Sequence, residues 1–193
     1  MKRIVTTALV SVLLLVCPAA WADFYPLTPP DPDLYDLEHQ KYYTWGIDTP
    51  WPQTEEAVAA TLSFTQIRNW REESNVLYIH LLDSAPAGLR SHWDGEHGGD
   101  NFDGQGIVLT IYYDLPTTPQ DLSYAFTDDQ VAALNAYAGD GRFALGFDPD
   151  CHFYNDGVQL DIVTQDTQIP EPATLGLLLL GSLALIARGY RRA

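Results

Sequence analysis

The sequence has few cysteines and few positive charges. Its 193 residues include two cysteines, and its ten lysines and arginines face 26 aspartates and glutamates. The resulting formal charge of −16 repels phosphate backbones, so we expect no nucleic-acid partner. One cysteine lies in the leader described below, so Cys151 is alone in the body and an internal disulfide scaffold is excluded. We expect Cys151 to be a buried structural thiol. The alternatives are an intermolecular disulfide and a reactive thiol. A hydrophobic content of 46% is too high for a disordered chain, and the length favours one domain.

The N-terminus has the pattern of a secretory signal peptide. Residues 1–16 combine a basic start with an apolar run, and the small residues Ala20 and Ala22 follow as a cleavage site. We therefore expect removal after Ala22. An uncleaved anchor is one alternative. Lipid attachment at Cys17 is another, although Val16 is not the small residue that a lipoprotein signal has at that position.

The C-terminus combines three features in a fixed order: a Pro-Glu-Pro motif, an apolar run and a basic cluster. As a helix, the run at 173–187 spans about 22 Å, which is short of the roughly 30 Å of a bilayer core. A buried core helix is the alternative, but such a helix normally has a polar stripe and this run has almost none. The residues of the motif and of the cluster are Pro170, Glu171, Pro172, Arg188, Arg191 and Arg192.

This tail resembles the PEP-CTERM sorting signal of Gram-negative bacteria. The resemblance implies recognition and cleavage near the Pro-Glu-Pro motif by an exosortase, an integral-membrane sorting enzyme. Before processing, the apolar helix would anchor the chain in the inner membrane, with the arginines on the cytoplasmic side and the body outside. Export then leads to the cell surface or the extracellular space of bacteria that make extracellular polysaccharide. The same tail is also labelled an ice-binding protein C-terminal domain, which describes the tail and names no ice ligand.

The body between the two terminal signals is more acidic than the whole chain. Residues 23–171 contain all 26 acidic residues and five of the ten basic ones. Their net charge is −21, which favours solubility and cation binding. We expect four segments: a signal peptide at 1–22, a lead-in rich in Pro and Asp at 23–42, a β-sandwich domain at 43–168 and the sorting signal at 169–193.

Short apolar and aromatic segments predict an all-β body. Asn155-Asp156-Gly157 is a strong tight-turn signal between two of these segments. Thr127 and Gln130 form a capping-box pattern and predict one short helix that ends near Gly139. The prolines of the lead-in predict an extended segment without regular structure. Together these signals predict a β-sandwich or jelly-roll-like domain with one short helix. The expected strands are residues 42–47, 58–65, 76–82, 107–113, 122–126, 142–147, 153–154 and 158–163.

Three central segments resemble a β-rich body that recurs on other PEP-CTERM proteins. They are residues 76–83, 98–106 and 146–152, and the resemblance extends roughly over 56–164. It supports the fold and implies no particular activity.

The loop at 91–104 is rich in glycine and in carboxylates, which are the ligands that Ca²⁺ prefers. Its spacing is not that of an EF-hand, and a solvated turn is the alternative. The three histidines His92, His97 and His152 lack a diagnostic zinc spacing. The candidate calcium ligands are Asp94, Glu96, Asp100, Asn101 and Asp103 in this loop, and Asp148, Asp150 and Asp156 in a second acidic group.

Trp93 lies in the same loop and is the candidate for stacking on a sugar ring. Trp45 and Trp70 are expected to be core or packing aromatics, and His80 is expected to be a buried, hydrogen-bonded residue. No G-x-S-x-G motif occurs, and no carboxylate or histidine stands out as catalytic. We therefore expect a non-enzymatic envelope or extracellular protein associated with exopolysaccharide. The alternatives are a Ca²⁺-dependent carbohydrate-binding module and a secreted hydrolase.

Overall fold

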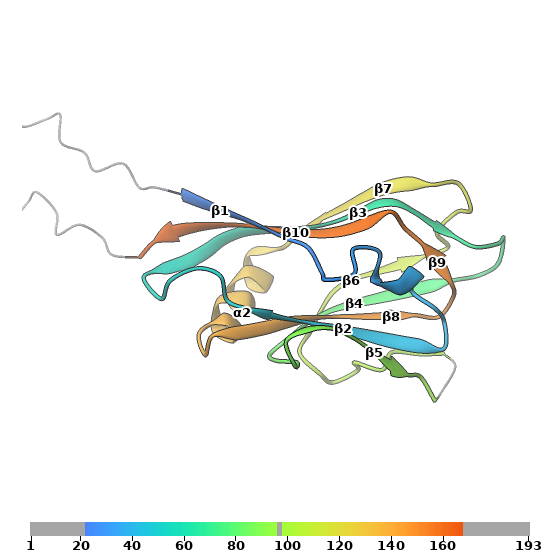
Figure 1. Ribbon diagram of the computed structural model, residues 1–193, viewed down its shortest axis with the longest axis horizontal. Helices are drawn as coiled ribbons and strands as arrows, with labels where there is room; N and C mark the ends of the chain where they lie inside the picture. The colour runs from blue at the N-terminus through green and yellow to red at the C-terminus, as the bar shows by residue number, and fades with distance from the viewer. Residues whose placement is uncertain (1–21, 96–97, 168–193) are drawn as a thin grey trace, which may run out of the picture. The chain divides into compact units, whose positions relative to one another are not determined.

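A computed structural model describes residues 22–95 and 98–167 of the chain (Figure 1). Within them, Ala22–Gln165 form one compact unit that contains both sheets and the buried core. The part of the chain that is described has no helix long and apolar enough to cross a membrane. The predicted signal peptide up to residue 21 and the predicted sorting helix lie outside the described residues.

The body consists of two five-stranded antiparallel sheets that pack face to face with one short helix, which confirms the predicted fold class (Figure 1). The first sheet has the order β1-β10-β3-β7, with β9 paired to β3, and the second has the order β5-β2-β8-β4-β6. The strands of the first sheet are β1 (Ala22–Leu27), β3 (Glu55–Asn69), β7 (Gln120–Ala125), β9 (Phe153–Tyr154) and β10 (Gly157–Asp166). Those of the second are β2 (Lys41–Asp48), β4 (Val76–Leu82), β5 (Gly88–Trp93), β6 (Ile107–Tyr113) and β8 (Arg142–Pro149).

Large apolar side chains from both sheets fill the space between them. Phe64 of β3 meets Phe147 of β8 edge to face, with ring centroids 6.1 Å apart. Each such buried side chain contributes roughly 1.5–3 kcal/mol relative to its exposed state. The predicted core position of Trp45 is confirmed, because that side chain is buried in this cluster.

The helix α2 (Asp128–Ala138) closes one open side of the sandwich. Its capping box is confirmed, since the Thr127 side chain accepts a hydrogen bond from the Gln130 amide and the Gln130 side chain accepts one from the Thr127 amide. Asn135 fixes the helix to β3, because its side-chain amide both donates to the Ala57 carbonyl and accepts from the Ala57 amide, each at 2.8 Å.

The lead-in is more regular than its prolines suggested. Residues 22–27 form β1, an edge strand that pairs with β10, and Leu34–Asp36 form a short 3₁₀ turn, η1. Strand β1 is solvent-exposed over most of its length, so it has no alternating apolar pattern. It forms because β10 offers an unpaired backbone edge, which is a tertiary effect that local sequence does not encode.

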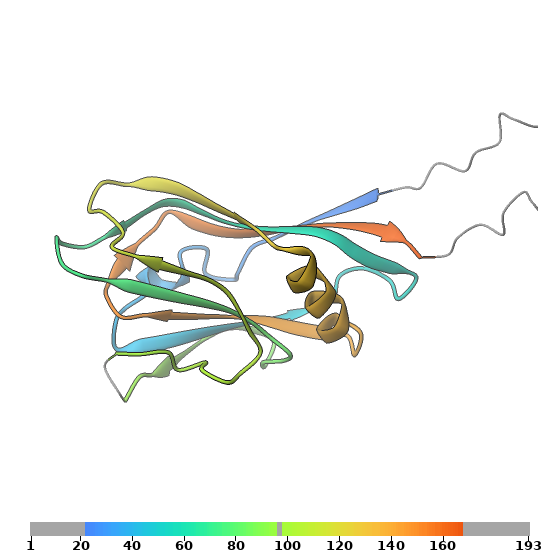
Figure 2. The ribbon, with the colours of Figure 1, turned by 180° about the vertical axis from the view of Figure 1, so that it is seen from behind.

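The two ends of the body lie together. Ala22 is the register partner of Gln165, so the chain enters β1 and leaves β10 at one end of the sandwich. Strand β2 begins and strand β5 ends at the other end, as both views show (Figures 1 and 2).

Candidate functional site

The turn η1 has a rare left-handed backbone. Four consecutive residues that are not glycine, Leu34, Tyr35, Asp36 and Leu37, have φ angles of 58, 55, 56 and 37°. A left-handed L-residue costs roughly 1–2 kcal/mol, so this turn forms only where its surroundings fix it.

Buried contacts on both sides of the turn supply that constraint. The side chains of Leu34 and Leu37 are fully buried in the core. The Asn155 side chain donates to the Asp33 carbonyl at 2.7 Å, and the Val158 amide donates to the Pro32 carbonyl at 2.7 Å. The turn is therefore anchored to the β9–β10 region by side-chain packing and by hydrogen bonds.

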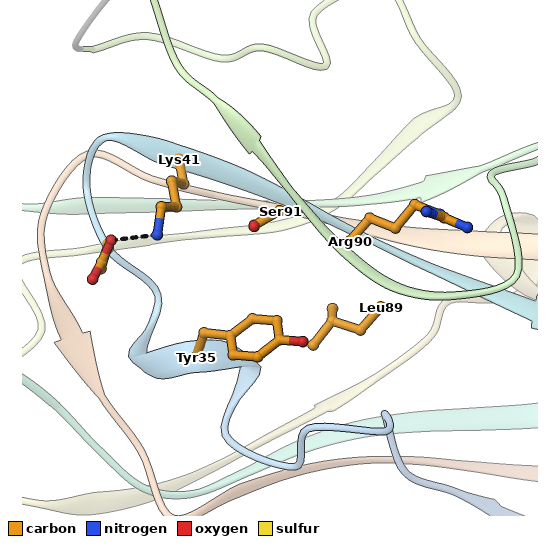
Figure 3. Close-up of a pocket in the computed structure, with 6 residues that line it drawn as sticks. Tyr35, Lys41, Leu89, Arg90 and Ser91 are labelled. Atoms are coloured by element: carbon orange, nitrogen blue, oxygen red, sulfur yellow. Dashed lines mark ion pairs between the residues drawn. The ribbon is translucent and has the colours of Figure 1, made fainter.

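The same turn turns Tyr35 outward, with 49% of its side chain exposed. Tyr35 lines an open cavity of about 570 Å³ beside the edge strand β5 (Figure 3). We call this cavity the β5 groove; its lining residues are Tyr35, Glu38, Lys41, Leu89, Arg90 and Ser91. In the view of Figure 3 the tyrosine ring reaches toward Leu89, while Lys41 and Arg90 lie on either side of Ser91.

The β5 groove is basic in a body that is strongly acidic. Lys41 pairs with Glu38 at 2.7 Å, which lowers the pKa of the Glu38 carboxyl. Arg90 is exposed, and its guanidinium has neither an ion pair nor a hydrogen bond to any residue that the structure describes. The other arginines of the body are engaged: Arg71 pairs with Glu73, Arg142 with Asp48, and Arg68 stacks on Tyr154 and donates to the Gln66 carbonyl.

Trp93 extends this surface. It is 65% exposed at the end of β5, and its register partner on β2 is Lys41. Because alternate residues of a strand point to one face, Leu89, Ser91 and Trp93 share a face, and Arg90 leaves this edge strand on the other side while still lining the groove. The predicted stacking residue is thus an exposed aromatic next to the groove.

A second cavity of about 400 Å³ lies by β6, the opposite edge strand of the same sheet. Its lining includes the exposed Tyr113 together with Asp114 and Asp150. The two edges of this sheet therefore carry cavities of opposite charge.

The acidic loop covers the outer face of the second sheet. Phe102 packs on Leu82 and Ala144, and the Phe102 ring lies where a side chain on Gly146 would be. His80 is buried as predicted, with its Nε2 atom 2.9 Å from Asp100 Oδ2. These contacts make much of the loop a structural cover.

Five of the eight predicted calcium ligands gather under or within this cover. Asp148 Oδ2 accepts hydrogen bonds from the backbone and side-chain amides of Asn101, at 2.6 and 3.1 Å, and Asp150 Oδ2 accepts one from Gly99. Asp100 bonds His80, and Asp94 is buried next to Trp93. Of the other three, Glu96 lies outside the described residues, and Asp103 and Asp156 are exposed at separate turns.

The buried carboxylates have perturbed electrostatics. Burial raises the pKa of Asp148 to about 6, against the two hydrogen bonds from Asn101 that lower it, and nearby Asp94 and Asp150 raise it further. Burial also raises the pKa of Asp150. The second oxygen of each carboxylate, Oδ1, has no hydrogen-bond partner among the described residues. Nevertheless, no three His, Cys, Asp or Glu side chains of the described segments converge on one point, so calcium binding stays a prediction.

Cys151, His92 and His152 each pack against or bond to a neighbouring side chain. Cys151 is a buried free thiol, as predicted, and its Sγ donates to Glu73 Oε1 at 3.0 Å. Burial, followed by this hydrogen bond, raises the pKa of Cys151 to about 11. His92 stacks on Tyr42, whereas His152 packs on Tyr154.

Of the two expectations for Trp70, a core position is wrong, because the side chain is 45% exposed, and a packing role at the surface fits the structure. Its indole donates to Glu73 at 2.7 Å and Arg71 stacks on its ring, so a polar cluster holds it at the surface.

Sequence reasoning missed Tyr35 and Arg90. They are far apart in the chain and line one cavity only because η1 lies beside β5. The one local signal is the tyrosine-rich lead-in, which predicts no regular structure.

Residues 168–192 match the family described as the PEP-CTERM protein-sorting motif. The chain therefore combines a β-sandwich body with a C-terminal sorting motif, and that motif implies export, exosortase processing and anchoring of the C-terminus in the membrane before processing. No curated protein matches the sequence.

Several solved structures align weakly with part of this chain. A latent aurone synthase (polyphenol oxidase) aligns at 10% identity and a TM-score of 0.41, over 68% of this chain and 26% of that one, so the chain spans about a quarter of its length. A carbohydrate-binding module of a glycoside hydrolase family 9 protein from Ruminococcus flavefaciens FD-1 aligns at 10% identity and a TM-score of 0.37, over 73% of this chain and 98% of that one. Similarities this weak carry no argument about ligands.

Proposed function

We propose that the protein is a non-enzymatic, exosortase-sorted component of the cell surface or extracellular matrix of a Gram-negative bacterium, where its body associates with exopolysaccharide. The observation that carries this proposal is the sorting motif at 168–192, which follows a compact and strongly acidic body. The apolar tail holds the chain in the inner membrane, the arginines stay on the cytoplasmic side, and an exosortase cuts near Pro-Glu-Pro.

The arrangement of the body fits such a role. The chain leaves toward the tail from the end of β10, while β5 ends at the opposite end of the sandwich (Figure 1). A body attached through β10 thus presents the β5 groove away from its attachment point.

The proposal of a non-enzymatic role is supported by the state of the candidate nucleophile. Cys151 is buried, and its raised pKa keeps the thiol protonated near neutral pH. His152, its neighbour in sequence, packs on Tyr154 and Trp70 and not on the thiol. A secreted hydrolase remains the alternative with the least support.

The second candidate function is that of a carbohydrate-binding module, and the exposed Trp93 beside the groove favours it. Aromatic side chains combine a large apolar face with a polar edge, which suits the faces and hydroxyls of sugar rings. Calcium dependence of this binding is a further prediction, which the unpartnered oxygens of Asp148 and Asp150 support.

Cell fractionation tests the sorting proposal. Deleting residues 175–193 removes the apolar run and the basic cluster, so we expect a soluble periplasmic body. The matched control replaces Pro170, Glu171 and Pro172 with alanine and keeps the apolar run, so it should stay in the membrane fraction at full length. A deletion variant that still sediments with membranes would contradict the proposal.

A further inference from the structure

We propose that the β5 groove binds a polysaccharide that carries carboxylate groups, with Arg90 pairing to a uronate carboxylate and Tyr35 and Trp93 stacking on sugar rings. This inference rests on the polysaccharide association proposed above and names the class of ligand and the site.

The left-handed backbone of η1 supports a binding role for Tyr35. Four left-handed residues in a row are unfavourable, and the turn that they form exposes half of a tyrosine side chain to solvent. Buried Leu34 and Leu37 and the hydrogen bond from Asn155 hold the turn in this shape. Strain that the surrounding structure fixes in place is typical of binding sites, because it presents a side chain in one orientation without further ordering.

The positive charge of Arg90 supports an anionic ligand. Arg90 has no carboxylate partner among the described residues, whereas Arg71 and Arg142 each have one. A guanidinium binds a carboxylate through two parallel hydrogen bonds, so an exposed arginine without a partner suits a uronate. Lys41 adds a second cation to the lining, and Glu38 is the single acid against these two.

The large negative charge of the body does not prevent this contact. The Debye length at physiological ionic strength is about 8 Å, so charges farther from the groove are largely screened. The cavity at the opposite edge has Asp114 and Asp150 in its lining and repels the same ligand. The sign of the local charge therefore assigns an anionic chain to the β5 groove and not to the β6 cavity.

The length of the exposed row on β5 supports an extended ligand. Leu89, Ser91 and Trp93 lie on one face of β5 and span four residues, or about 14 Å at 3.4 Å per residue. Tyr35 reaches toward Leu89 in the lining of the groove (Figure 3), and Trp93 lies two positions beyond Ser91 on the same face of β5. Lys41, the register partner of Trp93, is on this face as well, whereas Arg90 alternates to the other side of this edge strand and still lines the groove. This row suits several residues of an extended chain better than a single sugar.

Titration of the body, residues 23–167, with polygalacturonate and with neutral dextran tests the inference. We expect saturable binding of polygalacturonate that weakens when salt rises from 0.05 to 0.5 M. Arg90→Ala should weaken it roughly tenfold or more, and Arg90→Lys by less, because lysine keeps the charge and loses the fork. Tyr35→Ala should weaken it roughly tenfold as well.

The matched control is Tyr113→Ala, which removes an aromatic that is 63% exposed from the acidic cavity at the opposite edge. It should leave the affinity within about twofold. Arg90, Tyr35 and Tyr113 are all exposed, and melting curves of the variants check that each remains folded.

The outcomes separate the two proposals. Equal binding of dextran and polygalacturonate, with no effect of Arg90→Ala, would overturn the anionic ligand and keep polysaccharide binding. No binding of either polymer would overturn both. Loss of binding on Tyr113→Ala, with Tyr35→Ala unaffected, would overturn the site.

Discussion

Asp148 makes the stability of the body depend on pH. This carboxylate is fully buried beneath the acidic loop, and one of its oxygens has no hydrogen-bond partner among the described residues. The perturbation is Asp148→Asn, which keeps an oxygen for the two hydrogen bonds from Asn101 and removes the negative charge.

The magnitude follows from the pKa of Asp148, which burial raises to about 6 from an ordinary value of 3.8. Because the pKa of this acid is raised on folding, the folded state binds the extra proton. The stabilisation is complete below the unfolded pKa and is lost as the pH rises through about 6. Between pH 5 and pH 7.5 the loss amounts to about 1.4 kcal/mol of unfolding free energy.

Urea denaturation of the body at pH 5 and pH 7.5, in EDTA, measures this effect. Other carboxylates also titrate, so the informative quantity is the free energy of unfolding of Asp148→Asn minus that of the wild type. It should increase by about 1–1.5 kcal/mol between the two pH values. The control Asp103→Asn, at an exposed position of the same loop, should show no such change. A pH-independent difference for Asp148→Asn would refute the assignment of a buried carboxylate with a raised pKa.

Three further predictions concern the loop and the thiol. Calcium at a hundred times its Kd should raise the melting temperature by roughly 5–10 °C relative to EDTA, and an unchanged temperature would leave the acids as solvating and structural groups. Gly146→Ala places a Cβ atom 2.8 Å from the Phe102 ring and should lower the free energy of unfolding, measured by urea denaturation, by about 1–3 kcal/mol. In the control Gly95→Ala the added Cβ atom meets nothing within 4 Å. Equal effects of the two substitutions would contradict the packing of the loop. Cys151 should react with iodoacetamide at pH 8 on the order of 100-fold more slowly in the folded protein than in urea, and comparable rates would contradict its raised pKa.

Much of the fold follows from local pattern. Strands β4 and β6 begin and end where their apolar runs do, and Thr127 caps α2 through the contacts that its sequence motif predicts. Most of β4 is buried, and β6 keeps a run of apolar and aromatic residues although it is an edge strand, so both leave a local signal. The edge strands β1 and β5 were not predicted, because their sequences lack such a run and their pairing depends on a neighbouring strand.

The candidate site was partly predictable. Trp93 in a polar loop suggested an exposed aromatic, and the structure places it there. The left-handed backbone around Tyr35 has no clear sequence signal, since none of its four residues is a glycine and Asp36 alone among them is of a type enriched in that conformation. Arg90 is a candidate ligand-binding residue only because no described carboxylate pairs with it, which is a property of the fold. The acidic loop suggested an ion site, but several of its polar groups bond the sheet beneath it.

The β5 groove is the proposed contact between the exported body and extracellular polysaccharide. The most direct measurement is retention of the body, residues 23–167, on polysaccharide purified from the producing bacterium, compared with a Tyr35→Ala, Trp93→Ala double variant that melts at the same temperature. The wild-type body should be retained, and the double variant should pass through. Equal retention of both, or retention of neither, would contradict the proposed contact.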